Sequence, residues 1–275
     1  MKARARWNEA LRSLSIPPAI LAAAPESPRG SDADLFRLRT EFALRGDLSP
    51  SNRRALEALP LGGSVLDVGV GAGAASLPLA SRASLILGVD PAPDMLSCFE
   101  RCAAMVGVRV EAVLGSWPEI ASQIQPADVV VCHHVVYQAG DLVPFVEALS
   151  THARRRVVIE ATESHPLAWM ADLWLRFHGV RRSPGPTADN ATAVIQEMGI
   201  PVRREDHVLA PLPTGFEHRQ DAVAEVRRRL CLPPERDPEI ERALGGRLVR
   251  REGLWTSFPQ RQQMVTLWWD VTEAR

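Results

Sequence analysis

The sequence predicts a doubly wound α/β fold in which a mostly parallel sheet is flanked by helices. From Ser64 to Glu160, short β-branched runs alternate with helical patterns, which is typical of a parallel sheet with crossover helices. A glycine-rich turn follows the first of these runs. The 275 residues, 46% of them hydrophobic, suffice to bury a full core without disulfides or metals.

Helices are expected in the segment that precedes the alternation. Trp7, Leu11 and Leu14 recur at helical spacing, and a similar pattern follows at residues 35–42. Ser49 and Pro50 mark the start of a third helix, which runs to about residue 59, because serine caps helices and proline fits their first turn. We interpret these helices as an N-terminal preface rather than as a domain with a core of its own.

The alternating segment accounts for five strands and four connections. The expected strands are residues 65–68, 85–89, 108–114, 128–132 and 157–160. The expected connections are helices at 74–81, 92–104 and 142–152 and a short helical turn near 118–123. Five strands joined in this way are explained most simply by one doubly wound sheet.

Beyond Glu160 the alternation stops and helices dominate. Helical patterns occupy residues 166–177, 187–198, 218–230 and 238–244, and strands are expected at 202–209 and 263–269. We interpret this part as a helical insertion before a closing strand.

Composition excludes several classes of protein. With 32 basic and 33 acidic residues the net charge is −1, which disfavours a protein that binds nucleic acid by neutralising phosphates, although a local basic patch stays possible. No apolar run is long enough to cross a bilayer and no signal peptide is apparent, so we expect no membrane partner and a cytoplasmic location. The four cysteines are scattered, and we interpret Cys98 and Cys102 as buried thiols and expect no metal.

The most informative segment is the turn after the first strand, where Gly69, Gly71 and Gly73 follow Asp67. Glycines let the backbone approach a ligand closely, and a helix behind them offers free N–H groups. The run from Gly69 to Ala74 also satisfies the dinucleotide-binding fingerprint, so an enzyme that binds a nicotinamide cofactor is an alternative interpretation.

Two carboxylates indicate the kind of ligand. Asp67 stands where it would face an ammonium group, and such a carboxylate is an odd neighbour for a pyrophosphate. Asp90 ends the second strand, where its oxygens can accept both hydrogen bonds of a ribose diol. A ligand with a ribose and an amino-acid end fits both positions.

These motifs resemble those of the class I S-adenosylmethionine-dependent methyltransferases. The resemblance rests on four segments in order, at residues 67–73, 88–96, 115–118 and 127–134. It covers roughly residues 64–160 and implies a seven-strand Rossmann-like sheet, to which an antiparallel strand at 263–269 would belong. It also implies S-adenosyl-L-methionine as the cofactor.

The resemblance assigns roles to individual residues. Asp67, Gly69, Gly71 and Gly73 would hold the methionine part of the cofactor, while Asp90, followed by Pro91, would hold the ribose. Met95 would lie against the adenine, although packing in the core is an equally good interpretation. Many members of the family carry Gly-Asp where this chain has Gly115 and Ser116, so Ser116 would bind the adenine amine more weakly, with Trp117 as a stacking substitute.

Candidate bases for the acceptor follow the fourth and fifth strands. His133, His134, Tyr137, Glu160 and His165 face the ligand crevice in a doubly wound sheet. Histidine is the natural base near neutral pH. The alternative is that one of His133 and His134 packs against the cofactor and the other caps a helix.

The sequence therefore predicts a methyltransferase that acts on a small molecule. Alternatives are an RNA or protein methyltransferase, a nicotinamide-binding oxidoreductase and a non-catalytic cofactor-binding module. Residues 1–60 would form a helical lid, 61–162 the cofactor-binding core and 163–275 a C-terminal part. Aromatic residues of the lid and of the helix at 166–177 would enclose the acceptor: Trp7, Phe42, Trp169 and Trp174. The alternative for the helix at 166–177 is that its apolar side chains belong to the ordinary core.

Overall fold

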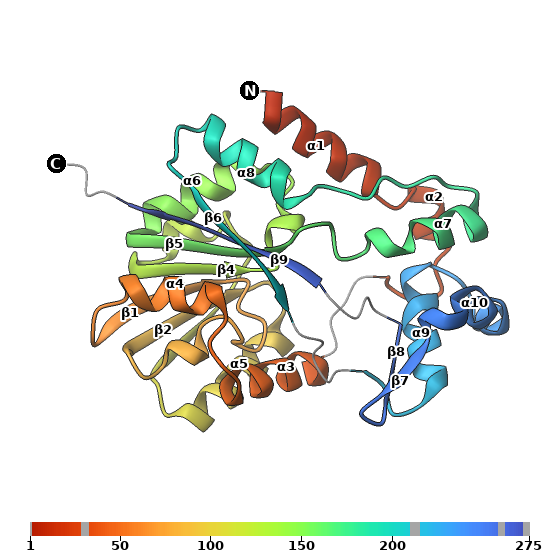
Figure 1. Cartoon of the computed structure of the whole chain (residues 1–275), viewed down its shortest axis with the longest axis horizontal. Coiled ribbons are helices and arrows are strands. Elements are labelled where there is room, and N and C mark those ends of the chain that lie inside the picture. Colours follow the sequence, from red (N-terminus) through yellow and green to blue (C-terminus); the bar gives the residue numbers. More distant parts are fainter. Residues whose placement is uncertain (1, 29–32, 210–214, 258–261, 272–275) are drawn as a thin grey trace.

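A seven-stranded sheet forms the centre of the computed structural model, which describes residues 2–28, 33–209, 215–257 and 262–271 (Figure 1). The strand order is β3-β2-β1-β4-β5-β9-β6. The strands of this sheet are β1 (Gly63–Val68), β2 (Ala83–Asp90), β3 (Val110–Leu114), β4 (Ala127–His133), β5 (Ala153–Thr162), β6 (Arg203–Leu209) and β9 (Gln262–Asp270). The sheet and its flanking helices are the doubly wound arrangement that the sequence predicts.

Strand direction places the candidate residues at one edge of the sheet. Strands β1 to β5 pair in parallel, and β9 pairs antiparallel with both β5 and β6. As a result β6 runs in the same direction as β5. The carboxyl ends of β1, β2, β4, β5 and β6 therefore meet at a common edge, where ligands of doubly wound sheets bind.

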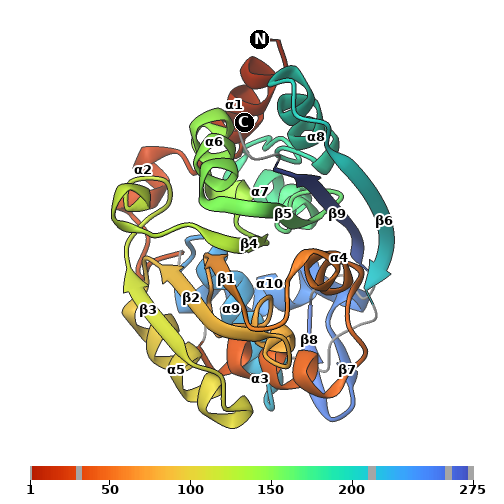
Figure 2. The ribbon, with the colours of Figure 1, turned by 90° about the vertical axis from the view of Figure 1, so that its left-hand side faces the viewer.

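Helices cover both faces (Figure 2). The helices of the described chain are α1 (Lys2–Leu14), α2 (Pro18–Ala22), α3 (Ala33–Arg45), α4 (Pro50–Ala58), α5 (Pro93–Val106), α6 (Leu142–His152), α7 (Ala171–His178), α8 (Ala188–Glu197), α9 (Arg219–Arg229) and α10 (Asp237–Leu244). Helices α1, α6 and α8 lie on one face of the sheet, and α3, α4 and α5 lie on the other.

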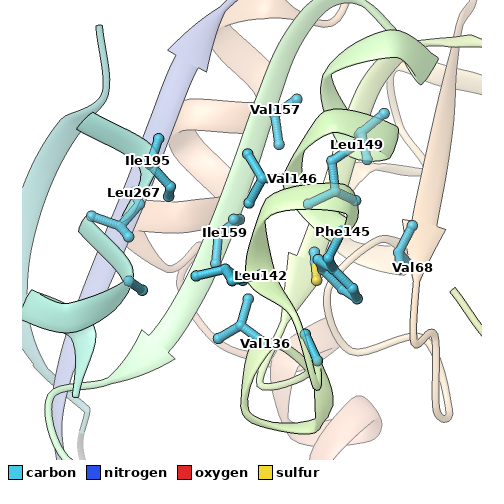
Figure 3. Packing of buried hydrophobic residues seen from close by; sticks show 14 of the residues in the cluster. Val68, Val136, Leu142, Phe145, Val146, Leu149, Val157, Ile159, Ile195 and Leu267 are labelled. Carbon is cyan, nitrogen blue, oxygen red and sulfur yellow. The ribbon is translucent and has the colours of Figure 1, made fainter. Parts of the chain in front are cut away.

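On the first face, α6 supplies the apolar side chains that meet the sheet. Leu142, Phe145 and Leu149 are almost fully buried, and they form one cluster with Val157 and Ile159 of β5 (Figure 3). These α6 positions lie three or four residues apart, so they share one side of the helix.

On the second face, α4 is part of the core. Its Ala55 packs in a cluster with Val65 of β1 and Phe99 of α5, all fully buried. Ser49 caps the helix by accepting a hydrogen bond from the backbone of Asn52, and Pro50 follows it, as the sequence predicts.

The segment after β5 has a third apolar cluster. Trp174 of α7, Val226 of α9 and Ile240 of α10 are buried together, and Ile16 and Ile20 from the N-terminal segment pack against them. Beside it stands the hairpin of β7 (Val249–Arg251) and β8 (Leu254–Thr256). Figure 1 shows these elements beyond the carboxyl edge of the sheet.

The N-terminal helices are distributed among all three clusters. Trp7 of α1 is fully buried on the first face, and its indole donates a hydrogen bond to the carbonyl of Ala139. Helix α2 joins the third cluster, whereas α3 and α4 lie on the second face.

None of the helices of the described chain is long and apolar enough to cross a membrane.

Three local expectations need correction. Residues 74–81 form only a 3₁₀ turn, η1 (Leu77–Leu79), because Pro78 has no N–H to donate. The helix expected at 166–177 begins with the 3₁₀ turn η4 (Ala168–Met170) before α7. Phe42 of α3 is partly exposed, whereas Phe36 of the same helix packs against the second cluster. The remaining 3₁₀ turns are η2 (Ala121–Gln123), η3 (Val136–Gln138), η5 (Pro234–Arg236) and η6 (Gly245–Arg247).

Candidate functional site

The glycine turn after β1 has a backbone that only glycine adopts readily. Gly69, Gly71 and Gly73 have φ angles of 74°, 52° and 91°. A Cβ atom at Gly69 would lie 2.3 Å from Val135, and one at Gly71 would lie 3.0 Å from the ring of Phe36. The turn is thus largely buried backbone, and there is no room for a side chain at Gly69 or Gly71.

Asp67 lies at the end of β1 with no exposed surface. Neither of its carboxylate oxygens has a hydrogen-bond partner among the described residues. Burial raises the pKa of Asp67 to about 7, and the Asp90 carboxylate adds to this rise. The nearby Ser76 hydroxyl opposes it, although that hydroxyl too has no hydrogen-bond partner among the described residues. A buried carboxylate without a partner is costly, so this position suits a ligand that brings a cation.

Asp90 lies at the end of β2 and is already oriented by the backbone. Its Oδ2 accepts a hydrogen bond of 2.9 Å from the N–H of Gly71, and its Oδ1 accepts one of 2.9 Å from Ala92. Each oxygen keeps a lone pair for another donor. Because the two bonds hold the carboxylate plane, Asp90 is suited to a pair of hydroxyl groups.

The other residues expected to bind the cofactor differ in their exposure at this edge of the sheet. Met95 is buried on α5, while Pro91 and Ser116 are exposed. The N–H of Gly115 donates to the carbonyl of Asp90, which ties the end of β3 to β2. Trp117 points away from the expected stacking role, because its ring packs against the first cluster and its indole donates to the Phe145 carbonyl.

Three histidines surround Glu160 of β5. Glu160 Oε1 lies 3.4 Å from His134 Nε2 and 3.9 Å from His133 Nδ1, and its Oε2 lies 3.8 Å from His207 Nε2. The structure thus brings together three of the expected residues. His207 was not expected: it lies on β6, and only the reversed direction of β9 brings that strand end to this edge.

The members of this group differ in exposure and charge. His133 and Glu160 have side chains about one-tenth exposed, whereas 43% of the His134 side chain is exposed. Burial lowers the pKa of His133 to about 4, so it is neutral near pH 7. Burial also disfavours the Glu160 carboxylate, but His133, His134 and Ser51 outweigh it and hold the pKa of Glu160 well below its usual range.

His134 has an unusual backbone. Its φ of 62° lies in the left-handed region, which is uncommon for a residue with a side chain. Its N–H donates a hydrogen bond of 2.8 Å to the Glu160 carbonyl. The expected helix-capping role is not seen, because α6 begins at Leu142 and its N-cap is Asp141, whose side chain accepts a hydrogen bond from the backbone N–H of Val143.

Tyr137 and His165 lie beside each other, with ring centroids 5.2 Å apart. The Tyr137 hydroxyl is engaged by Thr162, donating 2.7 Å to its carbonyl, and burial raises the pKa of Tyr137 to about 12. Burial lowers the pKa of His165 to about 4. Tyr137 is therefore an anchor for the end of β5 rather than a free proton donor.

A hollow of about 620 Å³ lies at the opposite edge of the sheet. Two of its arginines are paired, Arg156 with Glu57 and Asp270, and Arg155 with Asp128, whereas Arg154 forms no ion pair with a described residue. The hollow lies away from the carboxyl edge that holds the candidate cofactor residues. In the described part of the chain no group of three or more His, Cys, Asp or Glu side chains is placed so that it could hold a metal ion, and all four cysteines are buried and free.

Comparison with known proteins agrees with this arrangement. Residues 65–155 match the family model of a methyltransferase domain. Over 78 residues the chain is 38% identical to the ubiquinone biosynthesis O-methyltransferase of Azorhizobium caulinodans, which covers 28% of this chain and 31% of that protein. The matched segments span less than half of the lengths of the two curated relatives, 31% and 47%.

Solved structures share the fold at low sequence identity. The YcgJ protein of Bacillus subtilis aligns with a TM-score of 0.52 and 16% identity, covering 82% of this chain and 99% of its own. A protein of Galdieria sulphuraria, provisionally assigned as a sarcosine dimethylglycine methyltransferase, aligns with a TM-score of 0.51 and 14% identity, covering 96% and 99%.

The fold and the glycine-rich edge define a Rossmann-like methyltransferase architecture. The chain carries a class I S-adenosylmethionine-dependent methyltransferase domain, centred on residues 65–155.

Proposed function

We propose that the chain transfers a methyl group from S-adenosyl-L-methionine to a hydroxyl group of a small molecule. The observation that carries the choice of cofactor is the partnerless, fully buried Asp67 carboxylate beside the glycine turn. An ammonium group from the ligand would satisfy both oxygens and remove the cost of burying them.

The residues at the edge fit the cofactor in parts. Asp67 would face its ammonium group, with Gly69, Gly71 and Gly73 against the methionine part. Asp90 would accept hydrogen bonds from its ribose, with Pro91 following, and Met95, Gly115 and Ser116 would line the adenine. When bound, the cofactor supplies an electrophilic methyl group on its sulfonium.

A hydroxyl acceptor is supported by the contact between His134 and Glu160. Glu160 Oε1 lies 3.4 Å from His134 Nε2, which assigns the proton to Nε2 and leaves Nδ1 as the base. His134 would remove the hydroxyl proton, and the buried Glu160 carboxylate would stabilise the imidazolium that results. The more buried His133 would orient Glu160 without exchanging protons at neutral pH.

The alternatives are less well supported. A nicotinamide cofactor would place a pyrophosphate at the glycine turn, close to the carboxylates of Asp67 and Asp90, and like charges repel there. No observation on the described residues favours an RNA or protein acceptor. A cofactor-binding module without activity would not need an exposed histidine paired with a buried carboxylate.

The test has two stages. Calorimetry with S-adenosylhomocysteine and with NAD should show binding of the first only. A metabolite extract incubated with the protein and a cofactor carrying a deuterated methyl group should then yield a labelled product. Tighter binding of NAD, or cofactor binding without any labelled product, would overturn the proposal.

The base is tested with His134→Ala. We expect turnover to fall by roughly 10²–10⁴, the usual contribution of a general base, with S-adenosylhomocysteine affinity retained. The matched control is His218→Ala, since His218 is exposed and caps no helix through its side chain. Equal turnover of the two variants would exclude His134 as the base.

A further inference from the structure

One histidine at the carboxyl edge has no role in the proposed mechanism. The side chain of His207, on β6, is only 13% exposed. Both of its ring nitrogens are shielded from solvent, and neither has a hydrogen-bond partner among the described residues. A neutral imidazole offers one N–H donor and one acceptor, and burying both unused costs free energy. The stability of the fold therefore gives no reason for a histidine at this position.

The strand register places His207 on the same face of the sheet as Glu160. Glu160 of β5 lies opposite Thr266 of β9. His207 lies opposite Met264, two residues before Thr266. Opposite residues, and residues two apart along a strand, point to the same face. The Thr266 hydroxyl lies 2.7 Å from that of Ser51, so this is the face that α4 covers.

The two carboxylate oxygens of Glu160 face different histidines. Oε1 lies 3.4 Å from His134 Nε2 and 3.9 Å from His133 Nδ1. Oε2 is shielded from solvent and has no hydrogen-bond partner in the described chain, and His207 Nε2 lies 3.8 Å from it. This separation is too long for a hydrogen bond, but a shift of about 1 Å would form one. Because a carboxylate turns easily about its last bond, a donor at Oε2 decides how Oε1 meets His134.

His134 depends on Glu160 for both its backbone and its ring. The N–H of His134 donates a hydrogen bond of 2.8 Å to the Glu160 carbonyl, and the His134 ring faces the carboxylate of the same residue. The φ of 62° at His134 is one that a residue with a side chain keeps only where its surroundings fix it. Any freedom of the Glu160 carboxylate would therefore pass directly to the proposed base.

Glu160 is the acidic group that stays available to His207. The two residues that precede His207 on β6 are also acidic, but arginines already pair with their carboxylates. These pairs are Glu205 with Arg54 and Asp206 with Arg204.

We propose that His207 is a positioning residue for the methyl transfer: its Nε2–H donates to Glu160 Oε2 and so holds Oε1 against the Nε2–H of His134. The inference deepens the proposed function and rests on it for the role of His134 as the base. His207 acts through Glu160 and exchanges no proton with the acceptor. The contact between His207 and Glu160 can be tested without the cofactor.

The experiment compares wild type with His207→Gln, His207→Met and His218→Met. Glutamine and methionine are both unbranched and similar in length, but only glutamine keeps an N–H donor near the position of the imidazole Nε2. His218 is the matched control, because it is exposed and its side chain caps no helix. Urea denaturation measures the stability of each protein. NMR of the ¹⁵N-labelled free proteins at pH 8 shows which ring nitrogen of each histidine carries the proton.

In wild type, His207 and His134 should both carry a proton on Nε2. In His207→Met, His134 should become a mixture of its two tautomers. Turnover of a saturating metabolite extract with the deuterated cofactor should fall by about 10–100-fold in this variant, since small misplacements of a catalytic group have effects of this size. The extract dilution that gives half-maximal rate and the affinity for S-adenosylhomocysteine should not change. His207→Gln should restore the His134 tautomer and most of the turnover, and His218→Met should behave as wild type.

A purely structural role of His207 gives a different pattern. Both His207 variants would then lose stability, while the tautomer of His134 and the difference in turnover between glutamine and methionine would be absent from the result. The proposal is therefore wrong if His134 keeps its wild-type tautomer in His207→Met, or if the two His207 variants turn over equally.

The wild-type spectrum decides the matter even if His207→Met does not fold. His207 without a proton on Nε2 cannot donate to Glu160, and this result would overturn the proposal by itself. A failure of the proposed function is recognised separately: wild type then binds no S-adenosylhomocysteine or gives no labelled product, whatever the histidine tautomers are.

Discussion

Asp67→Asn should make the free protein more stable at high pH while weakening cofactor binding. The side chain is fully buried and has no hydrogen-bond partner among the described residues. Asparagine has the same shape but never ionises. Burial raises the pKa of Asp67 from 3.8 to about 7. In wild type, therefore, the folded protein holds this proton more tightly than the unfolded chain does.

The sign and size of the pH effect follow from that difference. Between pH 3.8 and pH 7 the folded state binds more protons, so the free energy of unfolding of wild type falls as the pH rises. Each pH unit in this window lowers the free energy of unfolding of wild type by about 1.4 kcal/mol. From pH 5 to pH 8, the stability difference should thus move in favour of Asp67→Asn by about 2–3 kcal/mol.

Urea denaturation at pH 5, 6, 7 and 8 measures this difference. Asp94→Asn is the matched control, because Asp94 is exposed at the start of α5. Calorimetry with S-adenosylhomocysteine should show binding weakened by about 1.5–3 kcal/mol in Asp67→Asn, the scale of hydrogen bonds to a charged group. A stability difference that is constant with pH would show that Asp67 is ionised with a partner, and the reasoning would be wrong.

Two further outcomes are expected. Asp90→Ala should weaken S-adenosylhomocysteine binding by about 1.5–3 kcal/mol, because the carboxylate that Gly71 and Ala92 hold in place is lost; unchanged affinity in calorimetry would remove Asp90 from the site. Trp7→Ala should lower the free energy of unfolding by about 3–5 kcal/mol, since its side chain is fully buried and bonded to Ala139; a loss below about 1 kcal/mol in urea denaturation would mean that α1 is dispensable for the fold.

Differences between expectation and structure have local causes. The apolar spacing of residues 74–81 is helical, but Pro78 permits only one 3₁₀ turn there. The sequence around Trp117 does not indicate that α6 packs beside its ring. The prediction that Trp117 stacks on the adenine was therefore compatible with the sequence but not with the structure. The first sixty residues lack a core of their own, and their helices are shared among three clusters formed by distant parts of the chain.

The sequence alone determined the features that depend on local chemistry. The alternation of strands and helices, the positive-φ glycines and the strand-end positions of Asp67 and Asp90 follow from spacing and from the backbone freedom of glycine. Tertiary structure decided which groups meet. His207 reaches Glu160 only because β9 runs antiparallel between β5 and β6. That Asp67 has no hydrogen-bond partner among the described residues is seen only once its burial is known. Pairing and burial depend on residues far apart in the chain, so no local pattern encodes them.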